Sequence, residues 1–319
     1  MATATVELAT RSTPRLADLA PQDRARALLG VWLAGKAETT VRAYRGDLER
    51  WAEWMGRGLD DALAELLGLG PGHANALALS YRGDLLEELA PSTVNRRLAA
   101  LRSVVKAART VGLISWDLDV TGVRSRAYRD TRGPGVGGYR AMMAALEEEG
   151  DTARVRRDRA LLALLYTLAL RRAEAVGLDM EDLELASRRI WIVGKGSRER
   201  EAMTVPEGTA QLLAEWLEVR GEEPGPVFLS LDRRAGGGRI HLNSVTRLVR
   251  RLGKAAGLGK VTPHGLRHAG ITRALDLTGG DARKVRALSR HAKLETLMLY
   301  DDARRDGAGG VAALLDADA

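Results

Sequence analysis

Three short stretches in the middle of the chain decide its fold class: RIWIV (residues 189–193), GKGS (194–197) and EAMTVP (201–206). The first has the alternation of a strand, the second has the glycines of a turn, and the third returns, so together they predict a β-hairpin. On both sides of this hairpin, apolar residues recur with the period of a helix. The helices that we expect there span residues 158–170 (capped by Asp158), 211–220, 243–256, 262–278, 281–289 and 296–305. The sequence therefore predicts a mainly α chain with a small antiparallel β-sheet, whose C-terminal part is an α+β domain.

The first third of the chain predicts a helical domain. One helix begins at Thr39 or Thr40 and another at Pro91, and each carries an apolar stripe at helical spacing. The stripe residues are Val41, Tyr44, Leu48, Trp51 and Met55 in the first helix, and Val94, Leu98, Leu101, Val105 and Ala108 in the second. The basic residues that fall opposite these stripes are Arg42, Arg50, Arg96 and Lys106. These faces are either ordinary solvated surfaces or candidate contacts to the phosphates of a nucleic acid.

The segment RSRAYRDTRGPGVGG (124–138) is interpreted as an interdomain linker. Its Gly-Pro-Gly sequence is unfavourable inside a helix or a strand. A plain linker needs only flexibility, whereas the arginines of this one would also suit a strap that follows a phosphate backbone. Those arginines are Arg124, Arg126, Arg129 and Arg132. The predicted organisation is a helical domain over residues 1–123, this basic linker, and an α+β domain over residues 139–319.

The composition excludes several classes of protein. The 319 residues include no Cys, which excludes disulfides, thiolate nucleophiles and cysteine-based zinc sites. Residues 1–24 lack the basic start and apolar run of a secretory signal, and the apolar run at 160–170 is too short to span a bilayer. We therefore expect a cytoplasmic protein with no membrane contact. The net charge of +7, with 42 Arg against 7 Lys, favours a polyanionic partner, although a GC-rich genome gives the same bias.

Two arginines are candidates for binding a phosphate. Thr262 and Pro263 predict a helix start that places His264 and Arg267 on one face of the first turns, where backbone N–H groups also attract anions. Arg171 ends an apolar helix and has Glu174 three positions later, which is also the pattern of an ordinary surface ion pair. A metal pair made of His264 and His268 is disfavoured, because no Glu lies between them.

Three further residues could take part in chemistry. Lys195 stands between two glycines at the hairpin tip, where it serves either solubility or proton donation to a leaving group. His291 and Tyr300 are nine residues apart, which places them about 180° apart on one continuous helix. They can share a site only if the chain bends between them, and a Tyr in such a helix commonly belongs to the core.

In their order and spacing, these residues together resemble the active-site motifs of the tyrosine recombinases, the phage-integrase and Xer-like family. The family's Leu-Arg-x-x-Glu motif is present at 170–174, its Gly-Lys-Gly hairpin at 194–196, and its His-x-Leu-Arg-His motif at 264–268; its third His and its Tyr are at 291 and 300. The resemblance covers nearly the whole chain, and it identifies the N-terminal helices as a core-binding domain. One departure is Ser289-Arg290, where many members have Leu-Gly, and it affects the local backbone before His291.

The resemblance implies a site-specific DNA recombinase that cuts and rejoins duplex DNA through a 3′-phosphotyrosine. Tyr300 is the implied nucleophile, Lys195 the proton donor to the leaving 5′-oxygen, and His264 the group that helps to take the tyrosine proton. The residues that would bind the phosphate are Arg171, Arg267 and His291, with Glu174 as an orienting residue. No metal or other cofactor is expected, because the two arginines supply the positive charge.

The resemblance also implies an assembly. Its expected form is a two-domain clamp on double-stranded DNA with a specific recombination site, four protomers holding two duplexes. The tail at 309–319 is expected to dock on a neighbouring protomer, the alternative being that it packs on its own. The other functions considered are a type IB topoisomerase-like strand transferase, a catalytically silent DNA-binding or architectural protein, and an RNA-binding module. The chain length, the intact catalytic set and the single Phe weigh against them in that order.

Overall fold

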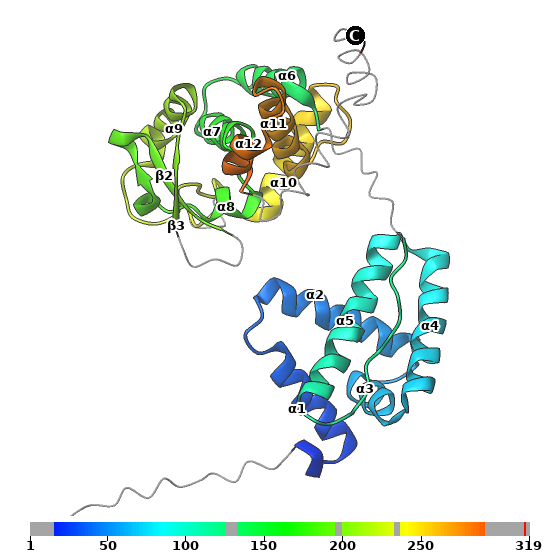
Figure 1. Cartoon of the computed structure of the whole chain (residues 1–319). Coiled ribbons are helices and arrows are strands. Elements are labelled where there is room, and N and C mark those ends of the chain that lie inside the picture. The colour runs from blue at the N-terminus through cyan, green and yellow to red at the C-terminus, as the bar shows by residue number, and fades with distance from the viewer. Residues whose placement is uncertain (1–15, 125–132, 195–199, 233–236, 291–315, 317–319) are drawn as a thin grey trace, which may run out of the picture. The chain divides into compact units, whose positions relative to one another are not determined.

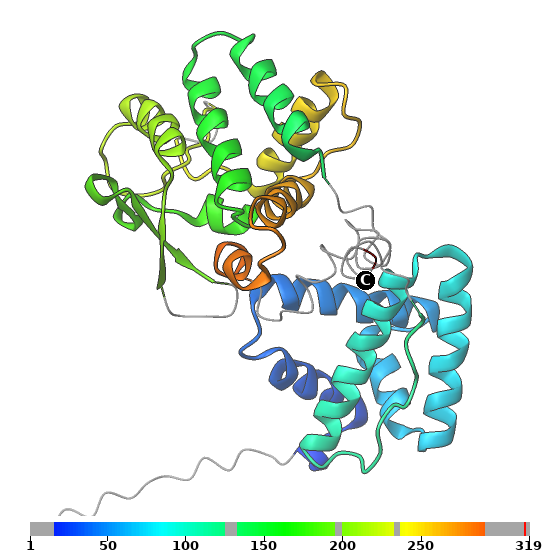
Figure 2. The same cartoon turned by 45° about the horizontal axis from the view of Figure 1, so that its top comes forward.

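The computed structural model describes residues 16–124, 133–194, 200–232, 237–290 and 316. Over these residues the chain is mainly helical with one three-stranded antiparallel sheet, which confirms the predicted fold class. The chain divides into two compact units, Met1–Ala127 and Tyr128–Ala319, called here the N-terminal and C-terminal units (Figures 1 and 2). In the same ranges, no helix has the length and apolar character needed to cross a membrane.

The N-terminal unit is built from helices around an apolar core. They are the 3-10 turn Leu16–Asp18, α1 (Pro21–Leu33), α2 (Glu38–Trp54), α3 (Leu59–Gly68), α4 (Pro71–Glu88) and α5 (Pro91–Thr110). Proline begins α1, α4 and α5, where its missing N–H has no helical partner to lose. The apolar stripe predicted for α5 is buried along its whole length, and it packs with Leu48 and Trp51 of α2.

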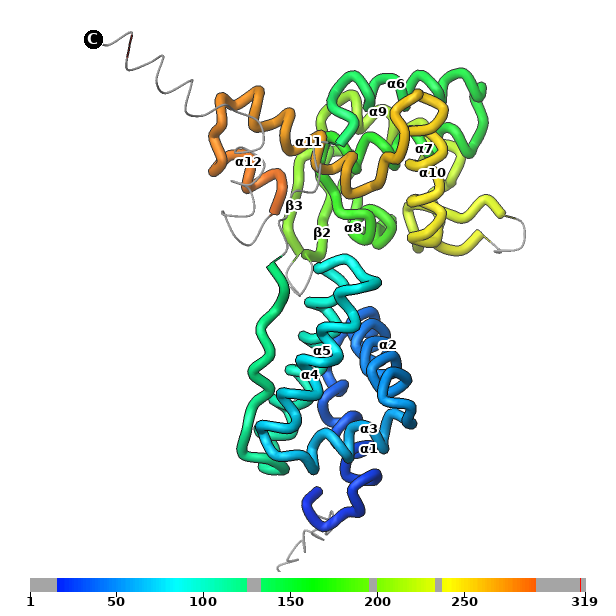
Figure 3. Tube along the Cα trace, turned by 90° about the vertical axis from the view of Figure 1, so that its right-hand side faces the viewer, coloured from blue at the N-terminus to red at the C-terminus, as the bar shows by residue number. Residues whose placement is uncertain are grey.

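After α5 the chain runs back along the N-terminal unit in an extended conformation (Figure 3). Asn95 of α5 holds this return segment, because its side-chain amide donates to the carbonyl oxygen of Val123 (2.9 Å) and accepts from the Val123 N–H (2.7 Å). The two bonds satisfy backbone groups that no regular element pairs.

The C-terminal unit combines seven helices with the small sheet among the residues that the structure describes. Its helices are α6 (Gly135–Glu147), α7 (Ala153–Thr167), α8 (Arg172–Gly177), α9 (Glu207–Arg220), α10 (Leu242–Ala255), α11 (Pro263–Leu277) and α12 (Ala282–Ser289). The strands are β1 (Leu183–Glu184), β2 (Arg189–Val193) and β3 (Arg200–Thr204), in the order β1-β2-β3, with 3-10 turns at Met180–Asp182 and Leu185–Ser187. The predicted hairpin is confirmed by the pairing of β2 with β3, in which Trp191 lies opposite Ala202.

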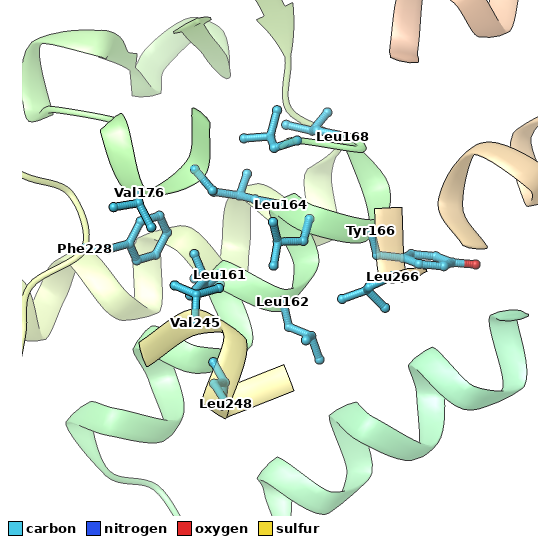
Figure 4. Close-up of a cluster of buried hydrophobic side chains, with 14 of the residues drawn as sticks. Leu161, Leu162, Leu164, Tyr166, Leu168, Val176, Phe228, Val245, Leu248 and Leu266 are labelled. Atoms are coloured by element: carbon cyan, nitrogen blue, oxygen red, sulfur yellow. The ribbon is translucent and has the colours of Figure 1, made fainter. Parts of the chain in front are cut away.

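Helix α7 lies at the centre of the C-terminal unit. Its first half carries arginines, whereas every residue from Ala160 to Tyr166 is buried, as expected for a stretch of helix that is apolar all round. Figure 4 shows Leu161, Leu162 and Leu164 of α7 among side chains from other elements, including Phe228 and Leu266. Burial of each such side chain contributes about 1.5–3 kcal/mol. This core fixes α8 and α11, which carry the candidate active-site arginines.

The start predicted for the helix before Arg171 is wrong. Thr152 caps α7 by accepting a hydrogen bond from the Val155 N–H (3.2 Å), whereas Asp158 lies inside the helix. Asp158 is 2% exposed, and its carboxylate accepts from the Arg157 guanidinium (2.7 Å). Its side chain is therefore used in a buried ion pair, and the helix begins earlier than predicted.

The end of the predicted linker also needs correction, because residues 135–138 belong to α6. Pro134 serves as the N-cap, and Gly135 has a φ of 65°, which glycine adopts without strain. A Cβ on Gly138 would lie 2.6 Å from the Cβ of Pro134, so the first turn of α6 packs too closely for any other residue. The glycines and the proline of this stretch thus start a helix, and Arg124 is the one arginine of the predicted strap within the described residues.

Candidate active site

Arg171 stands at the N-cap of α8 and is held by Glu174. Both Glu174 carboxylate oxygens accept from Arg171, Oε1 from Nη1 (2.6 Å) and Oε2 from the backbone N–H (2.7 Å). The Glu174 side chain is 4% exposed and that of Arg171 is 32% exposed, so this is a largely buried pair rather than a surface one. The bidentate contact fixes both the backbone and the guanidinium of Arg171.

Arg267 lies on α11 and is one of the most deeply buried polar residues described, at 1% exposure. Its Nη1 donates to the carbonyl oxygen of Ala169, and its Nη2 donates to that of Ser289. Ala169 has a φ of 47°, so the chain between α7 and α8 turns through the left-handed region at this contact. The Arg267 side chain thus joins α11 to the segment before Arg171 and to the end of α12.

The C-terminal end of α12 brings the two arginines together. The carbonyl oxygen of Ser289 accepts from Arg267, and the next one, that of Arg290, accepts from Arg171 Nη2 (3.2 Å). Two adjacent carbonyl groups therefore hold two guanidiniums that are 96 positions apart in the sequence. This arrangement can present two preorganised, positively charged forks to a phosphate.

His264 lies in the first turn of α11, as the sequence predicts. Thr262 caps this helix by accepting from the Gly265 N–H (3.0 Å). His264 is exposed, and its Nε2 lies 2.7 Å from the Nε2 of the buried His268. In such a contact one ring carries the proton and the other accepts it. The contact of His268 with the ring of His264 was not predicted from the sequence, although their spacing of four residues on a helix indicates that the two side chains are neighbours.

The remaining catalytic candidates, Lys195, His291 and Tyr300, lie outside the described residues, as do Arg126, Arg129 and Arg132. The structure nevertheless places the two strands that flank Lys195. Val193, the last residue of β2, pairs with Arg200, the first residue of β3. His291 directly follows Arg290 in the sequence, and therefore follows the carbonyl group that holds Arg171.

In the N-terminal unit the candidate phosphate contacts lie on α2, on α5 and at the end of the return segment. Arg42, Arg50, Arg96, Lys106 and Arg124 are all exposed. Arg42 pairs with Glu38 (2.8 Å), whereas Arg96 binds Asp47 (2.5 Å), which is 1% exposed. Burial raises the pKa of Asp47 against the opposing charges of Arg96 and Arg97. The buried carboxylate thus anchors an exposed arginine of α5 on α2.

The sequence comparisons with known proteins all indicate the same family. Residues 138–306 match the phage integrase family. The chain is 41% identical to a tyrosine recombinase of Synechococcus elongatus over 285 residues, covering 86% of this chain and 88% of the relative. It is 31% identical to the tyrosine recombinase XerC of Corynebacterium efficiens over 276 residues, covering 85% and 83%.

Solved structures share the fold at low sequence identity. A XerH site-specific recombinase bound to palindromic difH substrate aligns with a TM-score of 0.66 at 18% identity, covering 93% of this chain and 97% of that one. A lambda integrase dimer bound to a COC' core site aligns with a TM-score of 0.65 at 16% identity, covering 86% and 94%.

Proposed function

Because this chain belongs to the phage integrase family and is a tyrosine-type site-specific recombinase, we propose that it cuts and rejoins duplex DNA through a covalent bond to Tyr300. The tyrosine oxygen attacks the phosphorus, the bond from phosphorus to the 5′-oxygen breaks, and a 3′-phosphotyrosine and a free 5′-hydroxyl result. A 5′-hydroxyl from another strand reverses these steps. The phosphodiester energy is therefore kept in the protein–DNA bond, and no ATP is consumed.

The observation that carries the proposal is the convergence of Arg171 and Arg267 on the adjacent carbonyls of Ser289 and Arg290. Negative charge increases on the non-bridging oxygens in the transition state, and fixed donors stabilise it without reorganisation. In this proposal Arg171 and Arg267 bind those oxygens, and Glu174 orients Arg171.

The proton transfers are assigned to residues of the same site. His264, at the exposed start of α11, takes the proton of Tyr300, whose ordinary pKa near 10 makes it a weak nucleophile at neutral pH. Lys195 donates a proton to the departing 5′-oxygen, and His291 donates a hydrogen bond to the phosphate. Each transfer of this kind contributes about 10²- to 10⁴-fold to a rate.

The experiment that tests this function looks for the covalent intermediate and identifies its residue. The full-length protein is incubated with DNA that flanks its own gene, and with a nicked version that traps the intermediate, and the reaction is stopped with SDS. We expect protein attached to a 3′ end, and peptide mapping should assign the bond to Tyr300, one of six Tyr in the chain. Specific binding without an adduct on the nicked DNA, or attachment through another residue, would contradict the proposal.

The N-terminal unit is proposed as the core-binding domain, and the C-terminal unit from α6 onward as the catalytic domain. The exposed basic residues on α2 and α5 and the arginines of the 124–132 segment would bind DNA phosphates. The anchoring of Arg96 by Asp47 supports this role, because an arginine held in one rotamer loses less entropy on binding. The relatives that are solved with DNA include a lambda integrase tetramer on a Holliday junction, and we propose a tetramer on two duplexes here.

The tail at 309–319 is proposed to dock on a neighbouring protomer and to couple the active sites. A chain that ends at Asp306 is expected to keep its affinity for a single DNA site but to lose at least tenfold in the fraction of paired sites. Native gel mobility of single and paired complexes measures both quantities. Equal losses of single-site binding and pairing would refute docking between protomers.

A further inference from the structure

Arg290 occupies a backbone position that favours glycine. It follows the last residue of α12 with φ 52° and ψ 39°, the left-handed conformation in which a Cβ is strained. Nevertheless the residue is Arg, and its side chain is 6% exposed. A long cationic side chain that is buried at a strained position needs compensating contacts.

The Arg290 side chain makes such a contact with Glu174, the residue that holds Arg171. Nη2 of Arg290 lies 2.7 Å from Glu174 Oε2, the oxygen that also accepts from the Arg171 backbone N–H. Nη1 of Arg290 donates to the carbonyl oxygen of Leu288 (3.0 Å), which folds the side chain back over its own helix end. The carbonyl of Arg290 itself accepts from Arg171 Nη2. Arg290 therefore holds Arg171 in two ways, directly through its backbone and indirectly through Glu174.

The charges around Glu174 explain why a cation is useful here. Two guanidiniums, those of Arg171 and Arg290, share one carboxylate, so the group keeps a net positive charge. Burial acts to raise the pKa of Glu174, but Arg290 and the hydrogen bonds from Arg171 outweigh it and hold the pKa below its ordinary value. Glu174 is therefore ionised at neutral pH, and Arg290 reduces the extent to which it neutralises Arg171.

We propose that Arg290 is a positioning residue for the phosphate site: its guanidinium shares Glu174 with Arg171, and its strained backbone aims its carbonyl at the Arg171 guanidinium. The inference rests on the proposed function of Arg171 as a phosphate ligand. The Arg290 side chain, and not only the backbone at the end of α12, therefore supports catalysis.

Three substitutions separate the side chain from the backbone. Arg290→Gly keeps the left-handed conformation without strain and removes the guanidinium. Arg290→Lys restores a cation, and Arg290→Met restores the length without the charge. Arg283→Met removes an exposed arginine from the same helix and serves as the matched control for lost charge.

The readouts are single-turnover cleavage of nicked recombination-site DNA at saturating protein, and the Kd for the same DNA. A displacement of about 1 Å at a catalytic group costs about 10²-fold. We therefore expect Arg290→Gly and Arg290→Met to slow cleavage by about 10- to 100-fold with Kd within about twofold of the wild type. Arg290→Lys should regain at least half of that loss on a logarithmic scale, and Arg283→Met should cleave at the wild-type rate.

Several results would overturn the assignment. Wild-type cleavage by the Gly and Met variants would show that the side chain is dispensable. If the Arg290→Lys and Arg290→Met variants cleave equally slowly, the charge of the side chain has no role. If the Gly variant does not fold by circular dichroism, the comparison of Met with Lys decides alone. A wild-type protein that forms no adduct refutes the proposed function and this inference together, whereas an adduct with unaffected variants refutes only the latter.

Discussion

Replacement of Arg267 by lysine is expected to slow DNA cleavage by about 10²- to 10³-fold, the loss typical of one missing donor to a developing oxyanion. Arg267 is 1% exposed, and two arms of its guanidinium are already committed to the carbonyls of Ala169 and Ser289. A planar fork can hold these two groups and still direct donors in a fixed geometry, whereas a lysine ammonium at the end of a flexible chain cannot. Because most of the affinity for DNA comes from many phosphate contacts, we expect Kd to change by less than about threefold.

Single-turnover cleavage and DNA binding, measured on the same preparations, test this expectation. Arg273→Lys is the matched control, because Arg273 lies on the same helix and is exposed. It should cleave at nearly the wild-type rate. If Arg267→Lys cleaves within threefold of the wild-type rate, or if the control loses as much of its cleavage rate, Arg267 does not bind the phosphate in the transition state.

Elements that depend on neighbouring residues were predictable from the sequence. The stripe on α5 from Val94 to Ala108 has the helical period, and all of it is buried. The hairpin follows from β-type residues around a glycine-containing turn, and the pairing of Trp191 with Ala202 agrees with it. In both cases the information lies within about twenty residues, so burial of one face is enough to select the structure.

Features that depend on distant contacts were not predictable. Asp158 has the side chain of a helix cap, but it lies buried in mid-helix, where it accepts from Arg157, whose guanidinium also donates to the distant carbonyl oxygen of Leu229 (3.0 Å). The pairing of Arg290 with Glu174 joins residues 116 positions apart. The sequence shows that Arg290 replaces a common Gly, but only the structure shows what its side chain contacts.

The candidate active site was accessible in part. Arg171, His264 and Arg267 were identified from the order and spacing of motifs, because those side chains are characteristic of the chemistry. Glu174, which holds Arg171, was identified from the same motif as Arg171. The other groups that hold the two arginines are the backbone carbonyls of Ala169, Ser289 and Arg290, and a carbonyl has no signature in a sequence. The motifs therefore predict the side chains of this site, whereas the backbone groups that hold them follow only from the fold.

Replacement of Gly270 by alanine is expected to destabilise the C-terminal unit by about 3 kcal/mol, at the upper end of the usual cost of overpacking a core. A Cβ on Gly270 would lie 2.1 Å from the carbonyl oxygen of Tyr166, a backbone atom of the central helix α7. That oxygen cannot move aside as a flexible side chain would, so α11 must separate from α7. Intrinsic helix propensity favours Ala over Gly by about 1 kcal/mol and predicts the opposite sign.

Urea unfolding of the full chain, followed for the transition of the C-terminal unit, distinguishes packing from propensity. Gly137→Ala in α6 is the matched control, because a Cβ there meets no atom within 4 Å. It should leave the free energy of unfolding unchanged or increase it slightly.

The Gly270 variant should also cleave DNA more slowly than its folded fraction explains. Gly270 lies one turn from Arg267, and the same close approach of α11 to α7 brings Arg267 within reach of the Ala169 carbonyl. A Gly270→Ala protein with the wild-type midpoint of urea unfolding would show that α11 adapts to the added methyl group. If it also cleaves DNA at the wild-type rate, the position of Arg267 does not depend on this contact.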